Sequence, residues 1–135
     1  MDEIASFKSI VITSSTPDVT AHFYREVLGL PLAEEQHRGT ARHWACQLGS
    51  LHFAIHQRDG FWLPSSPSAG SPDAPDTVIS FNADVERFSP RFAQHGTEIV
   101  GRNKIGPMTF VAVRDPDQRT VCLGTPWPER SRRAQ

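Results

Sequence analysis

The chain has 135 residues, 38% of them hydrophobic and 21% charged, which supplies one packed domain but not two independent cores. Its 14 Lys and Arg against 15 Asp and Glu give a formal charge of −1, which excludes the strongly basic surface of a nucleic-acid-binding protein. No apolar stretch approaches the roughly 20 residues of a membrane span, and acidic residues follow Met1 where a secretory signal carries basic ones. We therefore expect a cytoplasmic protein with free thiols at Cys46 and Cys122 and with no membrane or nucleic-acid partner.

The predicted elements begin with a strand and a helix. Residues 7–14 are rich in β-branched side chains and end at a turn cluster, as a buried strand does. Thr16, Pro17 and Asp18 then supply a candidate N-cap, a proline suited to the first helical position and an acid at the positive end of the helix dipole. The helix that begins there is predicted to carry an apolar stripe and to end at a glycine: Val19, Phe23, Tyr24, Val27 and Leu28, then Gly29.

Three extended segments follow, at 32–36, 41–48 and 51–56, and Gly49-Ser50 predicts a two-residue hairpin turn between the last two. A hairpin closed there makes His43 and His56 cross-strand neighbours with β-carbons about 5 Å apart, which is chelating distance but supplies only two donors. One face of the hairpin is apolar enough to pack under the helix: Trp44, Cys46, Leu48, Leu51, Phe53 and Ile55. The opposite face is mixed: His43, Ala45, Gln47, His52, Ala54 and His56.

The same order of elements recurs in the second half of the chain. The predicted elements there are a strand at 77–82, a helix at 84–95, and strands at 98–101, 108–114 and 119–124. Pro90 inside the helix either removes a backbone hydrogen bond or delays the helix start. Arg102 and Lys104 fall in a predicted loop and are candidates for contact with an anionic ligand.

The repeat predicts an α+β fold of two tandem β-α-β-β-β modules, each a four-stranded curved sheet with one packed helix, that together form a cleft. The stretch between the modules is rich in Pro, Ser and Gly, as a linker is. The predicted organisation is a single domain over 1–135, with module one at 5–58, the linker at 59–76, module two at 77–126 and a tail at 127–135.

Two segments of the chain resemble signature segments of a known family. Residues 22–30 read HFYREVLGL and residues 114–118 read RDPDQ. Together with the duplicated element order, they resemble the vicinal oxygen chelate superfamily of glyoxalases, bleomycin resistance proteins and extradiol dioxygenases. The resemblance spans nearly the whole chain and implies the glyoxalase-like fold. Both segments indicate architecture and not a reaction, since their side chains suit a helix core, a helix end and a tight turn.

The resemblance also implies where enzymes of the family hold a divalent metal ion, through His, Glu or Gln at four cleft positions. Carried over onto this sequence, those positions are Ser9, Ala54, Val78 and Cys122. None is a usual ligand of the family, and a transition-metal site needs three or more imidazole, carboxylate or thiolate donors on one ion. We therefore expect no metal ligand and no cofactor, with a divalent metal ion as the alternative. Cys122 as a nucleophile lacks a recognisable base partner, so we expect no catalytic residue.

The expected cleft wall is mostly neutral, with hydrogen-bonding groups and some apolar area, as in a pocket for a small organic molecule. Phe61 and Trp62 either fold over its mouth or anchor the linker onto the body. The predicted ligand-binding residues are Ser9, Thr13, His43, Gln47, His52, Ala54, His56, Trp62, Val78, Ser80, Asn82, Phe110 and Cys122, with Val11, Met108 and Ala112 beside them.

We therefore interpret the chain as a metal-free binding protein, similar to the drug-sequestering resistance proteins of the family, that holds a planar or antibiotic-like ligand. Such proteins are symmetric dimers, so a homodimer is expected. The alternative is a lyase or dioxygenase of the same fold that uses an altered metal set or acid-base groups such as His43 and His56. A third hypothesis is a purely structural or protein-binding module with a collapsed cleft; Ser9 and Ala54 argue against it because small side chains leave space.

Overall fold

The computed structural model describes residues 4, 6–37, 41–63 and 77–126. The chain divides into two compact units, Met1–Pro75 and Asp76–Gln135. The predicted tail and most of the predicted linker, residues 64–76, lie outside the described residues. Among the described helices, none is long and apolar enough to cross a membrane.

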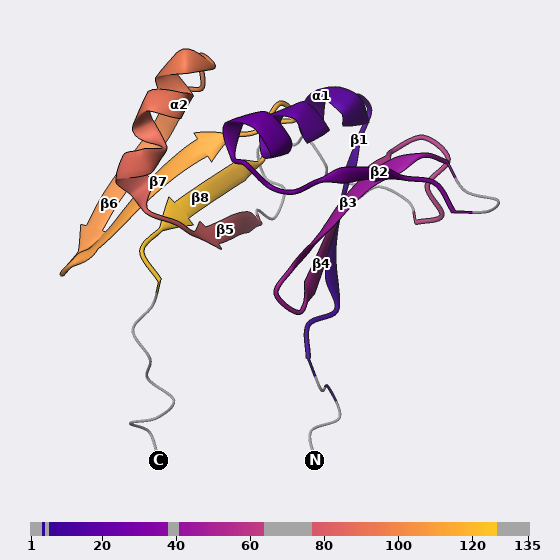
Figure 1. The fold of residues 1–135 in the computed structure, drawn as a ribbon, viewed down its shortest axis with the longest axis horizontal. Coiled ribbons are helices and arrows are strands. Elements are labelled where there is room, and N and C mark those ends of the chain that lie inside the picture. Colours follow the sequence, from indigo (N-terminus) through magenta and orange to yellow (C-terminus); the bar gives the residue numbers. More distant parts are fainter. Residues whose placement is uncertain (1–3, 5, 38–40, 64–76, 127–135) are drawn as a thin grey trace. The chain divides into compact units, whose positions relative to one another are not determined.

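The first unit is built on a four-stranded sheet whose strand order is β1 (Ser9–Ser14), β4 (Leu51–Gln57), β3 (His43–Leu48) and β2 (Ala33–Glu35) (Figure 1). β1 runs parallel to β4, and the other neighbours are antiparallel. Gly49-Ser50 joins β3 to β4 with Gly49 at a φ of 60°, so the predicted hairpin and its register are confirmed. Because the register is as predicted, the predicted division of this hairpin into two faces also holds.

The helix of the first unit begins at Pro17, as predicted, but differs from the prediction in three details. It consists of α1 (Pro17–His22) continued by a π-helical turn at Phe23–Val27, closed by the Leu28 N–H bonded to the Phe23 carbonyl oxygen at 3.2 Å. The Thr16 side chain makes no capping bond; instead the Ser14 hydroxyl accepts the Thr16 N–H at 3.0 Å. Val19, predicted in the apolar stripe, is 56% exposed.

The apolar side of this helix covers one face of the sheet. α1 contacts β4, β1 and β3, and the Tyr24 and Phe53 rings pack with centroids 5.2 Å apart. Tyr24, Phe53 and Ile55 are almost fully buried. The hydrophobic core of the unit therefore lies between the helix and this face, and the other face of the sheet is turned away from the helix.

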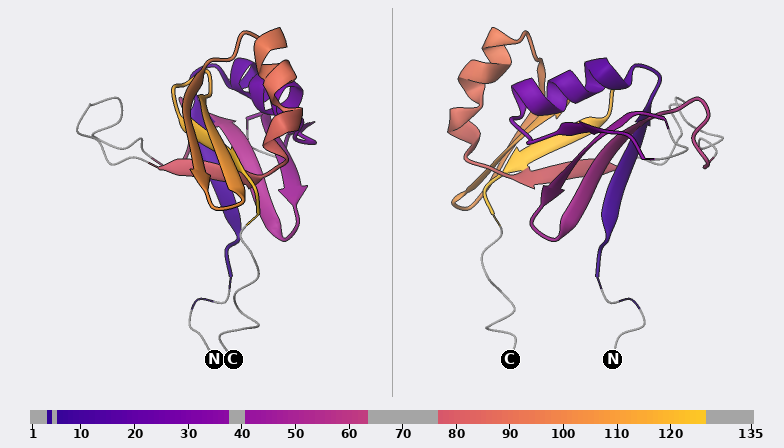
Figure 2. Two further views of the ribbon diagram at one scale, coloured as in Figure 1. Left: turned by 90° about the vertical axis from the view of Figure 1, so that its left-hand side faces the viewer. Right: turned by 45° about the vertical axis from the view of Figure 1, so that its right-hand side comes forward.

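The second unit repeats the arrangement, with strand order β5 (Val78–Asn82), β8 (Thr120–Gly124), β7 (Met108–Arg114) and β6 (Ile99–Ile105). Again the outer pair β5–β8 is parallel and the others are antiparallel. Figure 2 shows the β6–β7 hairpin (orange) from two further sides. The α+β class and the tandem repeat are therefore confirmed. The buried side of this sheet carries Ile79, Val111, Val113, Val121 and Leu123.

The predicted helix at 84–95 is interrupted. A short 3₁₀ turn, Val85–Arg87, precedes α2 (Ser89–Gln94), and Pro90 lies in the first turn of α2. A proline is tolerated there because that N–H has no partner within the helix, so Pro90 delays the helix start and removes no helical bond. Phe92 of this helix still lies in the core, where it is 1% exposed.

β6 is longer than predicted, and this corrects the placement of two cations. The strand runs to Ile105, where Gly106-Pro107 turns the chain with Gly106 at a φ of 58° and Ile105 pairs with Met108. Arg102 and Lys104 are therefore strand residues, not loop residues.

Candidate functional site

The first sheet has a face turned away from α1. In a sheet, residues paired across strands point to the same side. The register places seven of the predicted ligand-binding residues on this face, while their role in binding stays a prediction: Ser9, Thr13, His43, Gln47, His52, Ala54 and His56.

Histidine side chains cluster on this face near the β2–β3 edge. The rings of His43 and His56 stack with centroids 4.2 Å apart and planes 12° apart, which confirms the prediction that they are cross-strand neighbours. The His37 ring lies 5.1 Å from that of His43, and His43 is only 3% exposed. Burial, and then the nearby His43, His37 and His52, lower the pKa of His56, which favours its neutral form.

The Glu35 carboxylate lies within this histidine cluster. Glu35 is paired directly with His43 across β2 and β3. Its Oε2 is 3.3 Å from Nε2 of His43 and 3.5 Å from Nε2 of His37. Glu35 and His37 were not predicted as site residues. The available signal was their i, i+2 spacing at the end of an extended segment, which puts both on one side of the chain.

The two linker aromatics behave differently. The Phe61 ring packs 5.1 Å from the His56 ring, so Phe61 lies against the histidine cluster. Trp62 is 81% exposed. Phe61 therefore contacts a predicted cleft residue, which is compatible with both predicted roles, and Trp62 presents its indole to solvent.

The face of the second sheet away from its core carries five more of the predicted residues. The register places Val78, Ser80, Asn82, Phe110 and Cys122 on one side. A pocket of about 360 Å³ lies on this side, and its lining combines the predicted residues Phe110 and Cys122 with further residues of β6 and β7. The full lining is Gly101, Arg102, Asn103, Ile105, Phe110, Val111, Ala112 and Cys122.

Small residues make room in this second-unit pocket. Gly101 pairs with Ala112, and Ala112 pairs with Cys122, so the floor of the pocket has short side chains. The Phe110 ring lies over Gly124, where a β-carbon would overlap it. Asn103 and Ile105 were missed because the strand was predicted to end at Gly101; the Gly-Pro pair at 106–107 was the signal for a longer hairpin.

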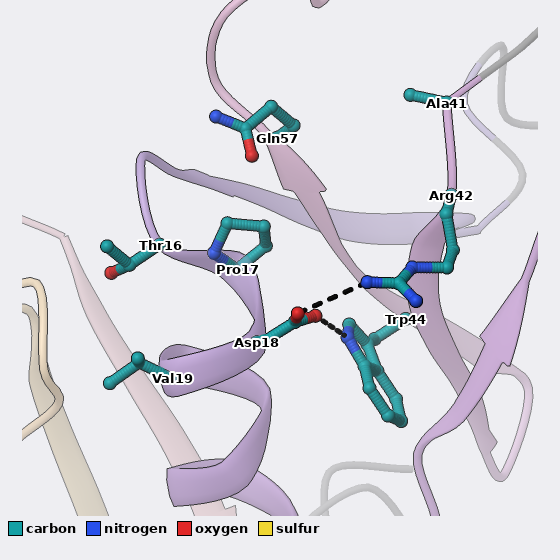
Figure 3. Close-up of a pocket in the computed structure, with 8 residues that line it drawn as sticks. All are labelled: Thr16, Pro17, Asp18, Val19, Ala41, Arg42, Trp44 and Gln57. Atoms are coloured by element: carbon teal, nitrogen blue, oxygen red, sulfur yellow. Dashed lines mark hydrogen bonds and ion pairs between the residues drawn. The ribbon is translucent and has the colours of Figure 1, made fainter.

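The first unit has a pocket of about 370 Å³ between the start of α1 and the start of β3 (Figure 3). In Figure 3, Asp18 points toward Arg42 and Trp44 and binds both. The Trp44 Nε1–H donates to the Asp18 carboxylate at 2.9 Å, and the Arg42 guanidinium donates at 3.2 Å. Because Trp44 belongs to the helix-facing side of β3, this pocket lies on the opposite side of the sheet from His43.

The four positions at which enzymes of the resembled family hold a metal ion do not fit one here. Ser9 and Ala54 lie on the first sheet, where Ala54 is 1% exposed and has no donor atom. Val78 and Cys122 lie on the second sheet, and of the four only the Cys122 thiol is a good transition-metal ligand. No reaction step through a metal at these positions follows from the residues present.

Comparisons with known proteins agree with this fold. A family model described as the Glyoxalase/Bleomycin resistance protein/Dioxygenase superfamily matches residues 6–123. A comparison with curated protein sequences gave no match.

Solved structures of similar fold include proteins with different roles. Lactoylglutathione lyase from Agrobacterium tumefaciens is 16% identical, with 92% of this chain and 96% of that chain covered and a TM-score of 0.66. TnmS3, an antibiotic binding protein from Streptomyces sp. CB03234, is 16% identical, with 94% and 100% covered and a TM-score of 0.66. Virulence protein STM3117 from Salmonella typhimurium is 21% identical, with 93% and 98% covered and a TM-score of 0.64. At these identities the likeness is one of fold.

Proposed function

We propose that this chain, which belongs to the Glyoxalase/Bleomycin resistance protein/Dioxygenase superfamily, is a binding protein for a small organic molecule and works without a metal ion at the family's four ligand positions. The ligand class is planar or antibiotic-like, and the working form is a homodimer. No cofactor takes part in this binding.

The observation that carries the proposal is the pocket of the second unit. Its volume of about 360 Å³ lies within the range of about 300–1,000 Å³ of small-molecule sites. Its walls are mostly apolar, with Ile105, Phe110 and Ala112 beside the amide of Asn103. An aromatic ring with one nearby amide suits a flat, mainly apolar compound that carries a hydrogen-bonding group.

Two further observations support binding over catalysis. Ser9, Ala54 and Val78 stand where the family's metal-dependent enzymes carry ligands, and none is an imidazole, carboxylate or thiolate. A protein of the same fold, TnmS3, is an antibiotic binding protein, so this fold accommodates binding of that kind.

A second candidate function is an enzyme of the same fold with an altered metal or acid-base set. The observation that favours it is the convergence of Glu35, His37 and His43 in the first unit, which provides donors and proton-transfer groups away from the family positions. A ligand that is chemically converted by the protein would support this candidate, and one that is recovered unchanged would support binding.

The test is a thermal-shift screen of planar aromatic and glycopeptide antibiotics with chelator-treated protein. A compound present at about 100 times its Kd stabilises the folded state by about 2.7 kcal/mol, which shifts Tm measurably. The variant Ala112→Leu fills the floor of the pocket and should abolish the shift. Val100→Leu is the matched control, because Val100 lies on β6, is 42% exposed and is not part of the pocket lining. If no compound shifts Tm, or if Ala112→Leu responds like wild type, the proposal fails.

A further inference from the structure

Three donor groups in the first unit converge on one point. One ligand atom each of Glu35, His37 and His43 lies within 4.8 Å of the others, the only such group in the described part of the chain. The paired strands β2 and β3 bring Glu35 opposite His43, and His37 follows two residues after Glu35. From this geometry we infer a binding site for a divalent transition-metal ion at the β2–β3 edge, formed by Glu35, His37 and His43.

The distances fit a tetrahedral ion. Donors that each lie about 2.0–2.1 Å from a tetrahedral ion are about 3.3–3.4 Å from one another. The Glu35 carboxylate oxygen Oε2 is 3.3 Å from Nε2 of His43 and 3.5 Å from Nε2 of His37. These two distances match the spacing around one tetrahedral ion, and the three ligand atoms all lie within 4.8 Å of one another.

The surroundings of His43 orient its Nε2 for a metal. Its Nδ1 lies 3.5 Å from the carbonyl oxygen of Ala41, and the His56 ring stacks on its face. When Nδ1–H donates to that carbonyl, the Nε2 lone pair meets the Glu35 carboxylate, so two acceptors oppose each other. A cation between them removes this repulsion. A backbone carbonyl behind the ring is also the common second partner of metal-binding histidines.

The donor set selects the kind of ion. Two imidazoles and one carboxylate suit Zn²⁺, Co²⁺ or Ni²⁺, whereas Mg²⁺ and Ca²⁺ prefer oxygen ligands alone. The His43 side chain is 3% exposed and the His37 side chain 69%, so the site has a buried anchor and is reached from solvent. Three protein ligands leave the fourth tetrahedral position for water.

This site is separate from the four family positions, and the inference does not rest on the proposed function. None of Glu35, His37 and His43 stands at Ser9, Ala54, Val78 or Cys122. A chain that binds an organic molecule in the second unit and a metal ion in the first satisfies both proposals, and each can fail without the other.

The test uses full-length protein without a histidine tag. The protein is loaded with Zn²⁺, dialysed extensively and examined by elemental analysis, and Co²⁺ is titrated into metal-free protein while visible absorption is followed. We expect one equivalent of Zn²⁺ per chain and the intense absorption of tetrahedral Co²⁺. Mutation of a residue that only hydrogen-bonds to a metal ligand typically weakens metal binding by about 10–100-fold. Glu35→Gln and His37→Gln change direct ligands, so each should weaken Zn²⁺ binding at least tenfold.

Matched controls separate ligand loss from general damage. Glu34→Gln alters the neighbouring carboxylate, which pairs with Arg42 at 2.9 Å and lies on the other side of β2, and His22→Gln removes an exposed helix histidine. Both controls should bind Zn²⁺ like wild type, and circular dichroism of the metal-free variants checks that all are folded. No retained Zn²⁺ in wild type, or equal retention in Glu35→Gln and His37→Gln, would overturn the inference.

Discussion

Asp115 is the residue on which the turn between β7 and β8 depends most. Its side chain is fully buried, and one carboxylate oxygen accepts the backbone N–H groups of Asp117 and Arg119 at 2.8 and 2.9 Å. The other oxygen accepts from the Arg119 guanidinium at 3.0 Å. The carboxylate thus closes the turn, where Gln118 takes a φ of 69°. We predict that its removal destabilises the whole second unit.

The magnitude follows from these three bonds. A hydrogen bond to a charged group contributes about 1.5–3 kcal/mol, and removing one partner of a buried ion pair costs about 3–5 kcal/mol. Asp115→Ala removes all three bonds, so the free energy of unfolding should fall by about 3–5 kcal/mol. Asp115→Asn keeps an oxygen for the two backbone groups but turns an amide toward Arg119, and should cost about 1.5–3 kcal/mol.

The assay is urea unfolding followed by circular dichroism and tryptophan fluorescence. Asp117→Asn is the control, because its carboxylate is partly exposed and makes one bond to Arg119, at 3.1 Å. The loss of stability should decrease in the order Asp115→Ala, Asp115→Asn, Asp117→Asn. An Asp115→Ala protein no less stable than Asp117→Asn would refute the reasoning.

Three further predictions concern the two pockets and the thiols. Gly124→Ala places a methyl group against the Phe110 ring; displacing the ring should cost about 1–3 kcal/mol of stability in urea unfolding and weaken binding in the second-unit pocket. Asp18→Ala breaks the exposed bonds to Arg42 and Trp44, so it should lower the free energy of unfolding by about 1 kcal/mol or less. A loss of stability that does not change with salt concentration would argue against an ion pair as its source. Burial raises the pKa of the Cys46 thiol, so iodoacetamide at neutral pH should modify the more accessible Cys122 first, as peptide mass spectrometry can measure; earlier modification of Cys46 would contradict this prediction.

Local signals in the sequence were sufficient for most of the fold. The Gly49-Ser50 turn, flanked by alternating apolar residues, determined the register that stacks His43 on His56. Pro17 marked the start of α1, and Gly29 takes the predicted left-handed conformation with a φ of 77°. These features depend on neighbours in the chain, which is why periodicity and turn chemistry reveal them.

The parts of the fold and site that were not predicted depend on how strands pair. The length of β6 is determined by its antiparallel partner β7, so Asn103 and Ile105 entered the second-unit pocket unpredicted. Glu35 joins the histidine cluster because β2 pairs with β3, and its short strand carries little pattern of its own. The π-helical turn at Phe23–Val27, which buries Phe23, Tyr24 and Val27, was not predicted either.

The central claim is that the second-unit pocket binds a small organic molecule without a metal ion at the family positions. Isothermal titration of the best compound from the antibiotic panel into chelator-treated protein, Zn²⁺-loaded protein and Ala112→Leu tests it most directly. The account predicts the same Kd with and without chelator, and no measurable binding to Ala112→Leu. Binding that requires a metal ion, or that is unchanged in Ala112→Leu, would contradict it.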